Sequence, residues 1–263
     1  MSRSGYMTAS PQQGCYFFHI PKTAGMSTWQ LLEWAYPPER ICPGRMWEDI
    51  INIGVQHLAK YDVFRGHFLA YLEPFLGRKL PTFTVLRNPV ERTISHYCHV
   101  RRSPEHPYYP VAQTLSLQEF CTDARTRHMV QNYQSGYLAC RCVKDPRLIA
   151  RGMTQADLAV YKLQLALDPS PDEFPSESDL YQAAMRRLES FFEVGTSETL
   201  HESMLAIAGG LGIQAPPHFE RRNVGSNRPE TIDDSTLRTI WASTQVDHAL
   251  YDLVQRRALV RAR

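Results

Sequence analysis

Long apolar runs are missing from this chain, since no stretch of its 263 residues approaches the roughly eighteen apolar residues of a membrane-spanning helix. The first fifteen residues also lack the charged and apolar regions of a secretory signal. We therefore expect a cytoplasmic protein without a membrane span. Hydrophobic residues make up 43% and charged residues 21%, which is typical of globular proteins. We expect a disordered or extended N-terminus at 1–14 and a single domain at 15–263.

An excess of charge of one sign is missing as well. The formal net charge is only +2, which argues against a dedicated nucleic-acid-binding protein. The chain also contains no H-E-x-x-H and no paired C-x-x-C, the usual signatures of zinc sites. We therefore expect no nucleic-acid partner and no metal cofactor.

The glycine pattern of the nucleotide-triphosphate loop, G-x-x-x-x-G-K-[ST], is absent too, but a related arrangement stands near the amino end. An aromatic and aliphatic run stops at Pro21, and a segment typical of a helix follows a polar turn made of Lys22, Thr23, Ala24, Gly25, Met26, Ser27 and Thr28. A strand, a short turn and a helix start gather backbone N–H groups and a positive dipole end at one point. This segment predicts a phosphate or sulfate site, to which Lys22 adds a point charge. The alternative is an ordinary strand–turn–helix with a solvated lysine.

A second segment of the same kind begins at residue 82. The β-branched and aromatic run 82–86 predicts a buried strand. In the helix that follows, Asn88 fits an N-cap, Pro89 the first position, and Glu91 a capping box. Helical spacing places Val90, Ile94, Tyr97 and Cys98 on the buried face and Glu91, Arg92, Ser95 and His99 on the other side. Arg87 and Ser95 are then within reach of one anion.

Both segments resemble motifs of sulfotransferases that use 3′-phosphoadenosine 5′-phosphosulfate (PAPS). The first is similar to the 5′-phosphosulfate loop of the carbohydrate branch, P-K-T-[AG]-[GS]-T-[ST], and the second fits the 3′-phosphate motif R-[DN]-P-[VI]-E-R-x-x-S-x-[YW] from Arg87 to Tyr97. The chain thus resembles sulfotransferase family 2, which includes the heparan sulfate 2-O and 6-O enzymes, in a soluble, bacterial-type form. The resemblance implies a P-loop-like sulfotransferase fold with PAPS as sulfuryl donor.

The pattern of apolar segments agrees with that fold. Strands expected at 16–20, 61–66, 82–86 and 191–194 alternate with helices and predict an α/β protein, with a small parallel sheet flanked by helices on both faces. We also expect a short helix at 127–133 and one final amphipathic helix that begins after Asp233 and Asp234. His19 is interpreted as a core histidine with satisfied hydrogen bonds.

His67 follows a predicted strand and a glycine turn, and ligands bind at this end of strands in open α/β sheets. The 2-O enzymes carry a similar H-G-H stretch that contains the catalytic base. The resemblance therefore gives His67 the role of general base, for which a neutral imidazole is suited. Arg65 replaces the first histidine of that stretch, and we expect Arg65 and His99 to contact the substrate. The alternative for His67 is a structural histidine that caps a turn.

Further residues are assigned by resemblance alone. Gly195 and Thr196 match a turn that lies near the adenine, and Ser226 and Arg228 match a late loop that closes over the 3′-phosphate. The segment 129–136 resembles the N-[YL]-Q-[ST] segment of bacterial members.

Together these features predict in-line transfer of a sulfuryl group from PAPS to a hydroxyl of a carbohydrate, glycolipid or small molecule. His67 would take the proton of that hydroxyl, and Lys22 would neutralise charge on the departing phosphate. One alternative is an ATP-dependent kinase of a small hydroxyl substrate with a degenerate phosphate loop. Another is a non-catalytic protein that binds adenosine bisphosphate or sulfated glycans at the same anion sites.

Overall fold

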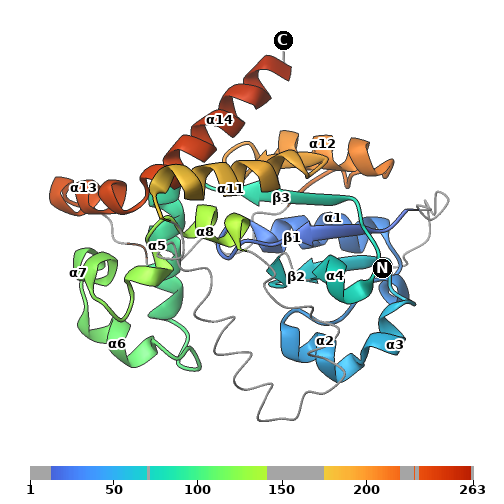
Figure 1. Cartoon of the computed structure of the whole chain (residues 1–263), viewed down its shortest axis with the longest axis horizontal. Coiled ribbons are helices and arrows are strands. Elements are labelled where there is room, and N and C mark those ends of the chain that lie inside the picture. The colour runs from blue at the N-terminus through green and yellow to red at the C-terminus, as the bar shows by residue number, and fades with distance from the viewer. Residues whose placement is uncertain (1–12, 70–71, 141–174, 220–227, 229–230, 262–263) are drawn as a thin grey trace.

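The computed structural model describes residues 13–69, 72–140, 175–219, 228 and 231–261 (Figure 1). Four parallel strands form one sheet in the order β2-β1-β3-β4. They are β1 (Cys15–Phe18), β2 (Val63–Gly66), β3 (Thr82–Leu86) and β4 (Glu193–Thr196). The helices are α1 (Gly25–Ala35), η1 (Pro38–Arg40), α2 (Trp47–Ile53), α3 (Val55–Leu58), α4 (Leu72–Leu76), α5 (Pro89–Val100), α6 (Tyr109–Thr114), α7 (Leu117–Thr122), η3 (Arg127–Met129), α8 (Tyr133–Ala139), α11 (Glu177–Glu189), α12 (Leu200–Leu211), α13 (Asp234–Ser243) and α14 (Gln245–Arg261).

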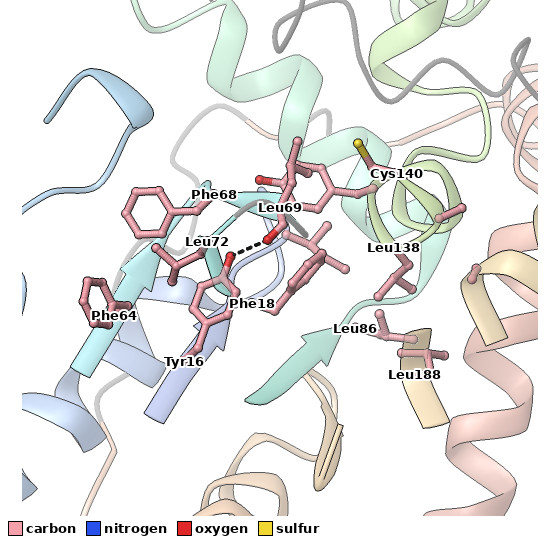
Figure 2. Packing of buried hydrophobic residues seen from close by; sticks show 14 of the residues in the cluster. Tyr16, Phe18, Phe64, Phe68, Leu69, Leu72, Leu86, Leu138, Cys140 and Leu188 are labelled. Atoms are coloured by element: carbon pink, nitrogen blue, oxygen red, sulfur yellow. Dashed lines mark hydrogen bonds between the residues drawn. The ribbon is translucent and has the colours of Figure 1, made fainter. Parts of the chain in front are cut away.

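Alternating side chains of the buried strands serve the two faces of the sheet, as the period of two requires. Cys15 and Phe17 of β1 pack in one cluster with apolar residues of α1 and α12. Tyr16 and Phe18 pack in a second cluster with residues of α8, α11 and α14. Figure 2 shows this second cluster, in which the Tyr16 hydroxyl donates to the Leu69 carbonyl at 3.0 Å. The predicted α/β architecture, a parallel sheet with helices on both faces, is confirmed.

The sheet has a reversal point between its two central strands, β1 and β3, because the connections that leave these strands lead to opposite sides of the sheet. From β1 the chain goes to β2 on one side, and then crosses to β3 on the other side. Ligands of open α/β sheets bind beyond the carboxyl ends of the strands at such a point. β1 and β3 pair over only two residues each, Tyr16 with Thr82 and Phe17 with Phe83. Beyond this point the Thr84 hydroxyl donates to the Phe18 carbonyl at 2.7 Å.

The strands differ in extent from the prediction, except that 82–86 is correct. β1 ends two residues before the expected limit of 20, since the chain turns away there, and β2 and β4 each begin two residues later than expected.

Two expectations about helices are wrong. The expected helix at 127–133 is a 3-10 turn at Arg127–Met129, and α8 begins only at Tyr133, after Asn132 in a left-handed conformation. The final helix is two helices with a break at Thr244. Asn132 is the physical reason for both, because its N–H donates to the Ser243 carbonyl and its side chain accepts from the Val246 N–H. The expected irregular segment 1–14 falls almost entirely outside the described residues, and Ser226 lies outside them too.

Candidate functional site

The loop between β1 and α1 is a tight turn with two left-handed residues. Lys22 has φ 74° and Ala24 has φ 65°, values in the left-handed region that residues other than glycine rarely adopt. The Thr23 hydroxyl donates to the Ile20 carbonyl at 2.8 Å, and that of Thr28 donates to the Ala24 carbonyl at 3.3 Å. Backbone strain of this kind gathers at ligand-binding sites and is offset by the surrounding structure.

Gly25 begins α1, and its lack of a side chain has a local cause. A Cβ atom at this position would lie 2.1 Å from Nε2 of His19, so the imidazole occupies the space that any other residue would need. Of the remaining predicted residues of this loop, Ser27 is buried on α1 and Met26 is exposed.

The junction between β3 and α5 has the predicted N-cap. The Asn88 side chain accepts from the N–H groups of Val90 at 3.0 Å and Glu91 at 3.3 Å, and Pro89 is the first residue of α5. Glu91 does not complete a capping box as expected. It lies 3.5 Å from Arg87, and both its oxygens accept from Arg228 at 2.6 Å. Glu91 therefore joins two of the predicted cofactor-binding arginines.

The two junctions meet. Nη1 of Arg87, at the end of β3, donates to the carbonyl oxygen of Lys22 at 3.3 Å. The residues are 65 positions apart in the sequence. The two predicted anion loops thus lie on the same side of the molecule, at the reversal point between β1 and β3. Ser95 lies two turns into α5, with a partly exposed side chain.

Arg92 ties the first loop to α5, and here the sequence prediction is wrong. Its side chain is 1% exposed, although helical spacing predicts the outer side of the helix. Nε donates to the Pro21 carbonyl at 3.3 Å, Nη1 donates to the Met129 carbonyl, and Nη2 lies 2.5 Å from Nδ1 of His96. The guanidinium also lies 3.6 Å from the ring centroid of Tyr133. Burial lowers its pKa to about 10, so the buried arginine keeps its charge at neutral pH.

Positive charge therefore accumulates around Lys22. Burial, and after it the charges of Arg102, Arg92 and Arg87, lower the pKa of Lys22 to about 8. A site that contains this much cationic charge favours an anionic ligand, which would raise the pKa of Lys22 again. Neither Arg92 nor Arg102 belonged to the predicted site.

His67 lies beside this cationic group, at the end of β2. Its Nδ1 is 3.1 Å from the His19 carbonyl and 3.4 Å from the Tyr137 hydroxyl. The pKa of His67 is lowered to about 4, mainly by burial and in part by the charge of Lys22, while the hydrogen bond to the His19 carbonyl opposes the shift. The imidazole is therefore neutral at physiological pH. A proton on Nδ1 that is donated to the His19 carbonyl leaves Nε2 as the basic atom.

His19 is not the satisfied core histidine that the sequence predicts. Its ring stacks on His67 at a centroid distance of 4.4 Å and on Phe17 at 4.9 Å. Its Nδ1 is buried and has no hydrogen-bond partner among the described residues. Burial lowers its pKa well below the usual value, so His19 is a neutral ring that supports the position of His67.

The two predicted substrate-binding residues belong to different elements, Arg65 to β2 and His99 to α5. Arg65 is buried, donates to Glu33 at 2.6 Å and lies 4.8 Å from the ring centroid of Trp29. His99, on α5, has Nδ1 3.3 Å from the Ser103 hydroxyl. The ring centroids of His99, His96 and His106 lie 6.0–6.5 Å apart, in a cluster that was not predicted. Burial and the charge of Lys22 lower the pKa of His99 to about 4, so it too is neutral.

Gly195 and Thr196 end β4 and border a cavity of about 440 Å³ between β4, α12 and α14. The polar groups of Thr196 already have partners in the protein. Its hydroxyl bonds with Thr199 at 2.8 Å and Gln255 at 3.2 Å, and its N–H and carbonyl both bond to the Ser203 hydroxyl.

Within the parts of the chain that the structure describes, no helix has the length and apolar character to cross a membrane. No group of three or more His, Cys, Asp or Glu residues there is arranged to hold a metal ion. A scan of the chain against protein-family models found no match, and a search of the curated proteins found none either.

Proposed function

We propose that this chain is a PAPS-dependent sulfotransferase that acts on a hydroxyl of a carbohydrate, glycolipid or small molecule. The observation that carries the proposal is the contact of Arg87 with the carbonyl of Lys22, at 3.3 Å. It joins two β-to-α junctions whose sequences resemble the two ends of one nucleotide site. A ligand with negative groups at two positions, such as a nucleotide with 3′- and 5′-phosphates, fits such a pair better than a ligand with one.

The donor set suits the phosphate and sulfate groups of PAPS. Lys22, the turn that follows it and the start of α1 would hold the 5′-phosphosulfate. Arg87, Ser95, Arg228 and Ser226 would hold the 3′-phosphate, and Gly195 and Thr196 would lie near the adenine. When bound, PAPS supplies an activated sulfuryl group.

The chain itself supplies charge and a base. Lys22 and the arginines around it stabilise negative charge in a partly buried site, where such interactions are stronger than in water. His67, neutral and held through Nδ1, takes the proton of the acceptor hydroxyl at Nε2. On the acceptor side we keep His99 of α5, which is half-buried, and Arg65 of β2, whose guanidinium would exchange its bond to Glu33 for one to the acceptor.

Three variants test this function. The protein is incubated with PAPS and a panel of hydroxyl acceptors, and sulfated products are detected by mass. We expect transfer by the wild type, none by Lys22→Ala, and a rate reduced about 10²–10⁴-fold by His67→Ala, with affinity for adenosine 3′,5′-bisphosphate (PAP) retained. His57→Ala, at an exposed position in α3, is the matched control and retains the rate.

Each remaining outcome has a distinct meaning. Wild-type transfer by His67→Ala would contradict the base assignment alone. Magnesium-dependent turnover of ATP, without use of PAPS, would favour the kinase instead. PAP binding with no transfer to any acceptor would favour a non-catalytic binding protein.

A further inference from the structure

The main chain of Arg87 lies where the sheet loses one of its strands. β1 pairs with β3 only as far as Phe17 and Phe83, so it offers no ladder partner to Arg87. On the other side of β3, pairing with the chain of β4 continues beyond the strand, since the Ser197 N–H donates to the Leu86 carbonyl at 2.8 Å. A buried backbone N–H or carbonyl without a partner is costly, so the groups of Arg87 need one from elsewhere.

Gln134 of α8 provides both partners. The Arg87 N–H donates to Oε1 of Gln134 at 3.0 Å, and Nε2 of Gln134 donates to the Arg87 carbonyl at 2.8 Å. A side-chain amide donates and accepts in one plane, so Gln134 does for Arg87 what a neighbouring strand does elsewhere in the sheet. Gln134 lies within 129–136, the segment that resembles the N-[YL]-Q-[ST] pattern and to which no role was assigned.

We propose that Gln134 is a positioning residue for recognition of the 3′-phosphate. It fixes the backbone of Arg87, so that the guanidinium is held against the Lys22 loop instead of sampling many orientations. The inference rests on the proposed function, because it takes Arg87 as the group that binds the 3′-phosphate.

Gln134 is itself firmly held. Its side chain is 2% exposed, and its N–H donates to Oδ2 of Asp247 at 3.1 Å. Ser135 bonds to Oδ1 of Asp247 through its N–H at 2.7 Å and its hydroxyl at 2.5 Å. Asp247 is a buried carboxylate of α14 that caps the start of α8. The position of Arg87 thus depends on a chain of hydrogen bonds that begins in the C-terminal helix.

The test compares PAP with adenosine 5′-monophosphate (AMP), which lacks the 3′-phosphate. Dissociation constants are measured by calorimetry for wild type, Gln134→Leu, Gln134→Asn and Thr126→Ala. We expect the wild type to prefer PAP and both Gln134 variants to lose about tenfold or more of that preference, with affinity for AMP changed less than about twofold. Thr126→Ala loses a buried hydrogen bond to the Phe120 carbonyl that lies outside this chain of hydrogen bonds, and it is expected to keep the preference. If Gln134→Leu does not fold, Gln134→Asn tests the same prediction, because its side chain is polar but too short to reach both groups of Arg87.

If the Gln134 variants lose affinity for PAP and for AMP by the same factor, the inference is overturned, since a purely structural role changes both affinities alike. A wild type that binds neither nucleotide, or does not distinguish them, would overturn the proposed function and this inference with it. The two failures are therefore distinguishable by the wild-type measurement alone.

Discussion

At the scale of single residues, the site depends on how closely His19 approaches the start of α1. We predict that Gly25→Ala destabilises the protein by about 1–3 kcal/mol, because the added Cβ would lie 2.1 Å from Nε2 of His19. Gly209 in α12 is the matched control, since no described atom lies within 4 Å of a Cβ there. Gly209→Ala is expected to stabilise the helix by up to about 1 kcal/mol. Urea unfolding of both variants measures the difference, and equal effects would contradict the close approach.

The lowered pKa of Lys22 predicts how the affinity for a nucleotide depends on pH. Its pKa in the free protein is lowered to about 8, first by burial and then by the arginines around it. A bound phosphate favours the protonated lysine, so affinity for PAP falls as pH rises through about 8, by up to about tenfold per pH unit. Calorimetry between pH 7 and pH 9.5 measures this fall.

A pair of lysine variants checks the source of that pH dependence. Lys22→Met is expected to bind PAP weakly and with a flat profile, whereas Lys60→Met, at an exposed position, keeps the wild-type slope. A wild-type affinity that stays constant from pH 7 to pH 9.5 would show that Lys22 does not bind the nucleotide.

At the scale of elements, the start of α5 combines a structural cap with the proposed 3′-phosphate site. We predict that Asn88→Ala lowers the free energy of unfolding by about 1 kcal/mol, because the N–H groups of Val90 and Glu91 lose their acceptor. Asp233→Ala removes the equivalent cap of α13 and is expected to cost about the same. Only Asn88→Ala should also weaken PAP binding, by about fivefold, and equal PAP affinity in the two variants would contradict this.

The elements that the sequence predicted well are those whose cause is local. The strand 82–86 and the cap at Asn88 follow from residue types over a few positions, and both are confirmed. The break between α13 and α14 was missed because its cause, Asn132, is more than a hundred positions away.

The same limit explains what was missed in the site. Arg92 is buried because its partners are the carbonyls of Pro21 and Met129, 71 and 37 positions away. Helical periodicity assigns a charged residue to the outside and carries no information on such partners. The grouping of His96 with His99 and His106 likewise required the folded chain.

At the scale of the whole molecule, we propose that one bisphosphate nucleotide binds across the reversal point of the sheet. The sheet sets this geometry, since parallel strands bring the ends of β1, β2 and β3 to one edge. α8 and α14 then hold the position of Arg87 through Gln134 and Asp247. Residues from most of the chain's length thus contribute to the proposed anion site.

The most direct test of this claim is the affinity for PAP and for AMP in the wild type, Lys22→Met and Arg87→Met. We predict that the wild type binds PAP more tightly than AMP. Lys22→Met is expected to lower the affinity for both nucleotides and to keep this preference, whereas Arg87→Met is expected to abolish the preference. An Arg87→Met variant that still prefers PAP as strongly as the wild type would show that the second junction does not bind the 3′-phosphate, and would contradict the account.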